Sequence, residues 1–175
     1  TLAMTFYADL DCSVIDELPP GRTPINTVLI DQARRDEVIA RIGVATGNNR
    51  QAYWVCTLIE ESETLDLEAA EATTTYLREQ LPEVAIGLVH GKLTPQQKFE
   101  VMTAFKEGEL DLLVATTVIE VGVDVPNASL MVIENPERLG LSQLHQLRGR
   151  VGRGAIESHC VLMYGSPLGQ DSKHR

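Results

Sequence analysis

The stretch Gln146-Leu147-Arg148-Gly149-Arg150-Val151-Gly152-Arg153 is the most informative part of this 175-residue sequence. It alternates arginines with glycines and belongs to an apolar-patterned run formed by Leu139, Leu141, Leu144 and Leu147. An arginine presents a planar fork of donors that binds phosphate oxygens through two hydrogen bonds. Glycines beside it let the backbone turn tightly and approach a ligand closely. The stretch therefore predicts a guanidinium that stabilises charge on a phosphoryl group during transfer, an effect of roughly 10³–10⁵ in rate.

The rest of the sequence lacks a loop that would hold a triphosphate. A phosphate-binding loop requires Gly-x-x-x-x-Gly-Lys-Ser/Thr. Residues 87–94 have one residue too few between their glycines, and Leu93 stands where the hydroxyl belongs. A Cys-x₅-Arg phosphatase loop would need arginine in place of Ser166, and no Asp-Glu pair follows an apolar strand to bind magnesium. The sequence thus predicts a phosphate-binding arginine whose phosphate is held elsewhere.

Composition narrows the class of protein. Hydrophobic residues make up 43% of the sequence, which is ordinary for a globular protein, and no apolar run approaches the ~18 residues of a membrane span. The start, Thr1-Leu2-Ala3-Met4, lacks the pattern of a secretory signal, and we take the sequence for an excised fragment. Cys12, Cys56 and Cys160 lie far apart without a Cys-x-x-Cys pair, which predicts no metal site but buried free thiols in a reducing cytoplasm.

Short β-branched runs alternate with helix-length amphipathic stretches. The expected strands are Thr27–Ile30, Ala52–Cys56, Ile86–Val89, Leu112–Ala115, Leu130–Ile133 and Cys160–Tyr164. The expected helices are Gln32–Ile42, Leu65–Leu81 and Pro95–Lys106. Such alternation predicts an α/β fold with a mostly parallel sheet and helices on both faces. The expected domain covers residues 25–167, between a proline-rich connector at 1–24 and a polar tail at 168–175.

All three expected helices carry an apolar pattern from which a buried face is predicted. For the helix 32–42 the residues are Val38, Ile39 and Ile42. For the helix 65–81 the residues are Leu65, Ala69, Ala72, Tyr76 and Leu77. For the helix 95–106 they are Phe99, Met102 and Phe105, with Thr94 as the N-cap and Pro95 in the first turn.

A parallel sheet of this kind holds its ligands at the carboxyl ends of its strands. Three polar stretches are expected there, namely His90-Gly91-Lys92, Thr116-Thr117 and Glu134-Asn135-Pro136. Within residues 115–126 the threonines can donate to phosphate, Gly122 allows close approach, and Asp124 can accept from a sugar hydroxyl. Taken alone, residues 115–126 are also compatible with a plain strand–turn–helix with threonine caps, and His90-Gly91-Lys92 is equally compatible with a structural turn.

Together these stretches resemble the motifs of superfamily 2 helicases. Residues 146–153 match the sixth motif, Gln-x-x-Gly-Arg-x-Gly-Arg, at every defined position. Residues 115–126 resemble the fifth motif, residues 51–57 the fourth, and residues 89–94 the companion of the fourth. The resemblance implies a RecA-like lobe with the fold of P-loop NTPases, which is the second of the two lobes of a helicase motor.

The resemblance also implies roles for individual residues. ATP and Mg²⁺ lie between the lobes and are held mainly by the first lobe, while Arg150 and Arg153 reach the γ-phosphate and Gln146 lies at the same cleft. Gly122 and Asp124 are implied to lie near the nucleotide ribose. Contacts to the DNA backbone are implied for Thr57, His90, Gly91, Lys92, Thr116 and Thr117.

Flanking residues narrow the resemblance further. Residues 4–24 and 114–154 are most similar to the branch of the superfamily that acts on branched DNA in recombination and replication-fork repair. Two alternatives stay open, namely a translocase that couples transcription to repair and a RecA-like lobe kept as a non-catalytic binding module. Because the P-loop is missing and the sequence ends soon after the sixth motif, we expect this chain alone neither to hydrolyse ATP nor to unwind DNA.

The net charge of −10 predicts weak DNA binding by the isolated chain. Binding to DNA gains much of its free energy from cations that displace counterions, and an acidic domain supplies few. We expect fluorescence anisotropy with a labelled duplex at physiological salt to give a dissociation constant well above the micromolar range. Submicromolar binding would contradict this expectation.

Overall fold

The computed structural model describes residues 24–57, 63–116, 125–154 and 157–165. The expected connector, apart from Pro24, and the expected tail lie outside these residues. The strands are β1 (Ile25–Asp31), β2 (Gln51–Cys56), β3 (Ile86–Val89), β4 (Leu112–Thr116), β5 (Ala128–Glu134) and β6 (Ser158–Tyr164). The helices are α2 (Arg35–Gly47), α3 (Glu63–Gln80), α4 (Pro95–Lys106) and α5 (Leu141–Arg148), with short 3₁₀ turns η1 (Gln32–Arg34) and η2 (Pro136–Arg138).

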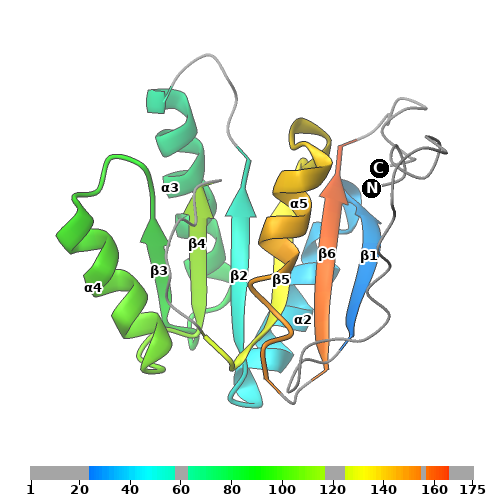
Figure 1. Ribbon diagram of the computed structural model, residues 1–175, viewed down its shortest axis with the longest axis horizontal. Helices are drawn as coiled ribbons and strands as arrows, with labels where there is room; N and C mark the ends of the chain where they lie inside the picture. The colour runs from blue at the N-terminus through cyan, green and yellow to red at the C-terminus, as the bar shows by residue number, and fades with distance from the viewer. Residues whose placement is uncertain (1–23, 58–62, 117–124, 155–156, 166–175) are drawn as a thin grey trace, which may run out of the picture.

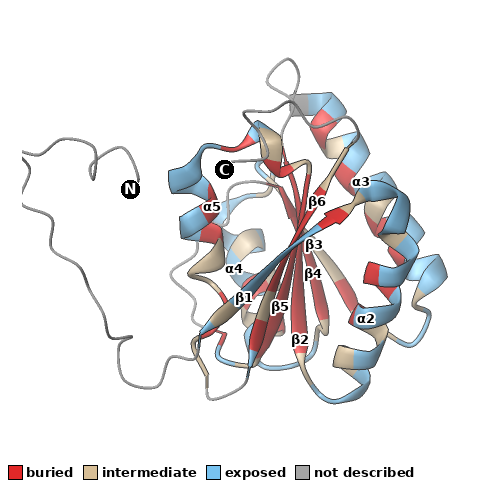
Figure 2. Cartoon of the chain, turned by 90° about the vertical axis from the view of Figure 1, so that its right-hand side faces the viewer, coloured by how far each residue is buried: buried red, intermediate tan, exposed pale blue. Residues whose placement is uncertain are grey.

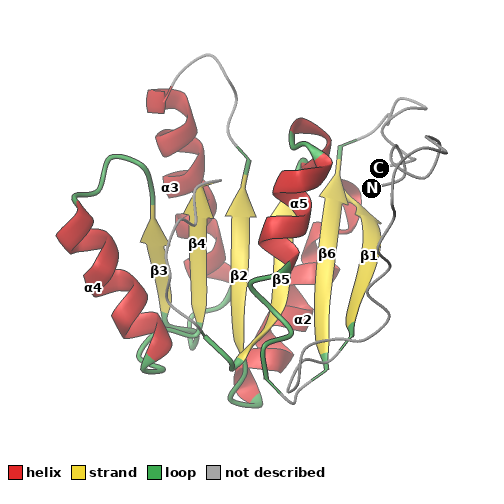
Figure 3. Cartoon of the chain, in the orientation of Figure 1, coloured by secondary structure: helices red, strands yellow, loops and turns green. Residues whose placement is uncertain are grey.

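The described strands form one six-stranded sheet in the order β1-β6-β5-β2-β4-β3. Every pairing is parallel, so all the arrowheads in Figure 3 point to the same edge. Helices α2 and α3 cover one face of the sheet, and α4 and α5 cover the other (Figures 1 and 2). The fold class predicted from the sequence is confirmed.

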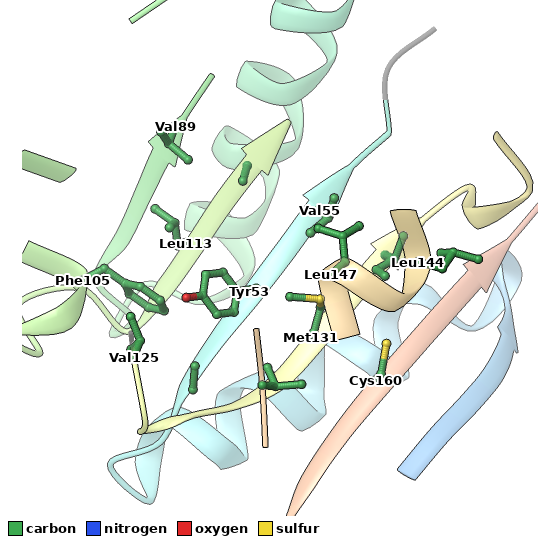
Figure 4. Close-up of a cluster of buried hydrophobic side chains, with 14 of the residues drawn as sticks. Tyr53, Val55, Val89, Phe105, Leu113, Val125, Met131, Leu144, Leu147 and Cys160 are labelled. Carbon is green, nitrogen blue, oxygen red and sulfur yellow. The ribbon is translucent and has the colours of Figure 1, made fainter. Parts of the chain in front are cut away.

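Each face of the sheet has its own apolar core. Tyr53 and Val55 of β2 point toward α4 and α5, where they meet residues such as Phe105 and Leu147 (Figure 4). The intervening Trp54 belongs to the core under α2 and α3. Every residue of β2, β4 and β5 is buried. The interior of each strand is an apolar run, which predicts a strand covered on both faces. The polar residues of these strands lie at or near the strand ends, namely Gln51, Thr116, Ser129 and Glu134.

Helix α4 begins and ends where the sequence predicts. The Thr94 hydroxyl accepts from the Gln97 amide at 3.2 Å, and the Gln97 side chain accepts from the Thr94 amide at 3.0 Å. This reciprocal capping satisfies amides that have no partner inside the helix, and Pro95 fits the first turn because it has no amide hydrogen.

The buried faces of α3 and α4 differ from the prediction. On α3, Leu77 is buried as expected, but Leu65 is 57% exposed and Tyr76 is 36% exposed. The buried positions are Asp66, Ala70, Thr74 and Leu77. Thr74 is tolerated there because its hydroxyl donates to the Ala70 carbonyl at 2.7 Å. On α4, Phe99 is 59% exposed, while Met102 and Phe105 are fully buried as predicted.

Two cysteines confirm the expectation of buried free thiols. Cys56 and Cys160 are free and buried, and Cys12 lies outside the described residues. Burial raises the pKa of each of the two thiols to about 12, so both stay protonated at neutral pH. None of the described helices combines the length and the apolar character needed to cross a membrane.

The buried face observed for α3 predicts that two leucines of this helix contribute very differently to the free energy of unfolding. Leu77→Ala should lower the free energy of unfolding by about 2–5 kcal/mol, because it leaves a cavity in the core. Leu65→Ala, the matched control, should change it by about 0.5 kcal/mol or less because Leu65 is largely exposed. Urea denaturation of both variants measures the difference. Equal losses of unfolding free energy in the two variants would mean that α3 does not bury Leu77 while exposing Leu65.

Candidate functional site

The carboxyl edge of the sheet brings together three of the residues expected to contact nucleic acid. Cys56 pairs with Thr116 across β2 and β4, and Val89 pairs with Ala115 across β3 and β4. Thr57 and His90 follow these positions directly, so they lie along one edge with Thr116. The edge is continuous because the strands are parallel and in register.

Thr57 contacts the turn that follows β5. Its hydroxyl donates to the Asn135 carbonyl at 3.3 Å. Asn135 adopts a left-handed conformation (φ 49°, ψ 56°), which asparagine tolerates better than most residues. The Asn135 amide donates to the Met163 carbonyl at 2.9 Å, so this turn joins β2, β5 and β6 at the edge of the sheet.

The expected turn His90-Gly91-Lys92 also lies at this edge, directly after β3. The Leu93 amide donates to the His90 carbonyl at 3.3 Å, and the Lys92 ammonium lies 3.4 Å from the Thr64 hydroxyl of α3. A Cβ atom added to Gly91 would meet no atom within 4 Å. Packing within the described residues therefore does not require glycine here, and the space beside it is open.

The stretch 146–153 lies on the face of the sheet covered by α4 and α5. Leu144 and Leu147 point from α5 into the core (Figure 4), which leaves Gln146 exposed on the opposite side of the helix. Arg150 follows Gln146 by about one helical turn, and its amide still donates to the Leu147 carbonyl at 3.0 Å. Gln146 thus lies on the outer side of α5, and Arg150 follows in the turn just after the helix.

The chain around Arg153 is held in place by its neighbours. Val151 is completely buried in the core. Gly152 has a φ of +72°, which favours glycine, and its amide donates to the Ser158 hydroxyl at 3.1 Å. The Arg153 Nε donates to the Gly149 carbonyl at 2.9 Å. A close backbone approach is found at Gly154, which directly follows the stretch, but it is an approach to protein. A Cβ atom there would lie 2.6 Å from the Pro126 carbonyl oxygen.

The predicted nucleotide and nucleic-acid residues therefore form two separate groups. Helix α5 starts at the carboxyl edge and runs back across the sheet (Figure 1). Arg150 and Arg153 lie beyond its end, and the following Gly154 packs against Pro126, just before β5 begins. Thr117, Gly122 and Asp124 were also predicted site residues, but they lie outside the described residues.

Sequence reasoning missed a buried ion pair beside the carboxyl edge. A nitrogen of Arg35, the first residue of α2, lies 2.7 Å from a carboxylate oxygen of Glu134 at the end of β5. Burial raises the pKa of the Glu134 carboxyl, and the Arg35 charge opposes that shift. The available signal in the sequence was a carboxylate that ends a continuous apolar strand.

The donors found at these places suit phosphate better than metal. Arginine, lysine, threonine and backbone amides are the groups that contact phosphate oxygens. Within the part of the chain that the structure describes, no three His, Cys, Asp or Glu side chains gather as metal ligands would.

Comparison with known proteins identifies the class of protein to which this chain belongs. Residues 33–155 match the helicase conserved C-terminal domain. The chain therefore belongs to this family. Domain 2 of the DEAD-box helicase Mss116p, solved with an RNA duplex, has the same fold with a TM-score of 0.62. It is 19% identical, and the match covers 81% of this chain and 54% of that one.

Within this class, the whole chain is similar to the ATP-dependent DNA helicase RecG, which confirms the resemblance inferred from the sequence. It is 69% identical to RecG of Pasteurella multocida and 68% identical to RecG of Escherichia coli K12. It covers 25% of each, so it spans about a quarter of their length. A solved structure of RecG bound to a three-way DNA junction is 46% identical with a TM-score of 0.78. The match covers 99% of this chain and 22% of that one.

The contact between Gly154 and Pro126 predicts that alanine destabilises the fold at Gly154 more than at Gly149. Gly154→Ala should lower the free energy of unfolding by about 1–3 kcal/mol, because its Cβ would be forced against a backbone carbonyl. Gly149→Ala is the matched control. Gly149 has helical dihedrals and meets only ordinary contacts at 3.4 Å, so the change should be less than about 1 kcal/mol. Thermal unfolding of both variants provides the measurement. Equal stability of the Gly154 variant and the unsubstituted chain would contradict the described packing.

Proposed function

We propose that this chain is the second motor lobe of a cytoplasmic ATP-dependent DNA helicase that acts on branched DNA in recombination and replication-fork repair. The observation that carries the proposal is the identity of 69% to RecG across the full length of the chain. The structure of RecG on a three-way DNA junction supports branched DNA as the partner. ATP hydrolysis, as a phosphoryl transfer to water, would drive movement along the DNA.

The arginines after α5 would complete an ATP site whose other half belongs to the first lobe. Arg150 and Arg153 supply guanidinium donors for the charge that develops on the γ-phosphate. Gln146, exposed on the outer side of α5, would face the same cleft. Gly122 and Asp124 would contact the ribose. This chain has neither a phosphate-binding loop nor, among its described residues, a cluster of metal ligands, so Mg²⁺ would be bound by the first lobe.

The carboxyl edge of the sheet would contact the DNA backbone. Thr57, His90 and Thr116 are aligned there, with Gly91 and Lys92 in the adjoining turn, and Thr117 would extend the row. Threonine hydroxyls and backbone amides can position a duplex without a large positive charge. This mode of contact suits a chain with a net charge of −10 better than a lysine-rich track would.

The rigid sheet would couple these two regions. The arginines lie beyond the end of α5, whereas the expected DNA contacts lie at the carboxyl edge. Nucleotide binding between the lobes would draw this lobe toward the first one as a rigid body. The DNA contacts would then move with it, as in other domain closures driven by a ligand.

Replacement of Arg153 tests this function in the full-length helicase that carries the lobe. Arg153→Ala should lower DNA-stimulated ATP hydrolysis by at least about a hundredfold, because an arginine that stabilises the transferring phosphoryl group contributes roughly 10³–10⁵ in rate. Nucleotide binding should persist, since the first lobe supplies most contacts. Steady-state hydrolysis and equilibrium binding of a labelled nucleotide measure the two effects separately.

Arg41→Ala is the matched control because Arg41 is exposed on α2, which covers the opposite face of the sheet. Its turnover should equal that of the unsubstituted enzyme. If Arg153→Ala also turned over at that rate, the arginine–glycine stretch would be only a structural turn. The chain would then be better explained as a non-catalytic binding module.

A further inference from the structure

The guanidinium of Arg35 is fixed on three sides. Its central carbon lies 5.2 Å from the ring centroid of Trp54 and 5.5 Å from that of Tyr76. Its end pairs with Glu134 at 2.7 Å, and the two side chains keep only 23% and 10% of their surface exposed. Aromatic faces attract a guanidinium. The ion pair is a charge contact through a single nitrogen, since the buried Arg35 Nε and Glu134 Oε1 have no hydrogen-bond partner among the described residues. Arg35 therefore holds the Glu134 carboxylate in one place.

Glu134 is the residue at which β5 ends and the edge turn begins. The next residue, Asn135, has left-handed dihedrals, and its carbonyl accepts the Thr57 hydroxyl. Glu134 is therefore joined by one peptide bond to the residue whose carbonyl orients Thr57, and the amide of that residue is also held by the Met163 carbonyl. A chain of contacts connects α2 to the carboxyl edge, through Arg35, Glu134, Asn135 and Thr57 in that order.

In the hydrogen bond between Thr57 and Asn135, a phosphate oxygen could replace the carbonyl as the acceptor. The length of this bond, 3.3 Å, exceeds the ~2.7–2.8 Å usual between two oxygens. The Thr57 hydroxyl has one proton to donate, and a charged phosphate oxygen accepts such a proton more strongly than a carbonyl does. Thr57 is only 8% exposed in this structure. Asn135 would therefore keep the hydroxyl oriented at the edge, and a phosphate would reach it by displacing this contact.

Stability alone does not account for an ion pair at this place. Removing two charges from water is costly, and apolar residues of similar volume are often at least as stabilising. A charged pair with a planar fork fixes direction, which apolar packing does less well. We propose that Arg35 is a positioning residue for DNA binding, which fixes the Thr57 hydroxyl at the carboxyl edge through Glu134 and Asn135. This inference rests on the proposed function, in which Thr57 contacts the DNA backbone.

The test measures ATP hydrolysis by the full-length helicase against the concentration of a branched DNA. Arg35→Met removes one charge, and Arg35→Met/Glu134→Leu removes both, so that neither charge is left buried without a partner. The half-saturating DNA concentration should rise about tenfold in both variants. The rate at saturating DNA should stay within about twofold, because the loss is one of binding. Arg41→Met, on the same helix but exposed, is the control and should match the unsubstituted enzyme.

Salt dependence separates positioning from direct contact. Arg35 binds a carboxylate rather than a phosphate, so its replacement should leave the slope of DNA affinity against salt concentration unchanged. A slope reduced by about one would show a direct phosphate contact and overturn the proposal. Thermal unfolding checks that each variant is folded. If the other variants are unfolded, Arg35→Lys replaces them in the DNA-binding measurement, because it keeps the charge but loses the planar fork. This variant should also bind DNA more weakly than the unsubstituted enzyme.

Thr57→Ala, measured in parallel, separates this inference from the proposed function. If Thr57→Ala weakens DNA binding while the folded double variant binds normally, the role of Arg35 is refuted and the DNA contact stands. If neither variant affects DNA binding, the assignment of Thr57 to DNA contact fails, and the inference fails with it. Weaker binding in both variants, with the salt slope kept for Arg35→Met, supports the inference.

Discussion

The burial of the central strands on both faces is the constraint on which the site depends. Every residue of β2, β4 and β5 is buried, the last residue of each strand included, so exposed side chains at the carboxyl edge of the sheet come from the turns that follow the strands. Parallel pairing brings all those ends to one edge. Polar residues that follow the strands, Thr57 and His90 among them, are therefore collected in one row. The fold itself creates a line of contacts that suits the backbone of an extended ligand.

The arginines after α5 are held by packing that has no chemical role of its own. Val151 is buried between Arg150 and Arg153, and Gly154 is pressed against Pro126. The glycines therefore serve the local fold first. Gly152 allows a left-handed turn, and Gly154 allows a backbone contact where no side chain fits. A loop anchored in this way can present a guanidinium to a nucleotide with little loss of entropy, which favours preorganised stabilisation of charge.

Much of the fold was predictable because its boundaries have local causes. Strand β3 and helix α4 lie at the predicted residues; an apolar run defines the first, and Thr94 with Pro95 begins the second. The orientation of α3 was not predictable from apolar spacing, because its buried face includes Asp66 and Thr74. Helix α5 was not among the expected helices, although the spacing of its leucines was noted.

For the candidate site, the predictable part is the position of its residues in the fold. Motif spacing and parallel topology place Thr57, His90 and Thr116 correctly at strand ends. The ion pair of Arg35 with Glu134 was missed, since it joins residues far apart in the sequence that no short motif connects. Such contacts depend on the packing of α2 against the sheet, which a sequence pattern does not specify.

In the proposed function, this lobe supplies arginines to a nucleotide held by another lobe. The decisive measurement is a crystal structure of the full-length protein with ADP and aluminium fluoride, which mimics the transferring phosphoryl group. We expect guanidinium nitrogens of Arg150 and Arg153 within about 2.7–3.2 Å of the fluoride atoms. A closed complex in which both arginines stay away from the nucleotide, with Arg153 still bonded to the Gly149 carbonyl, would contradict it.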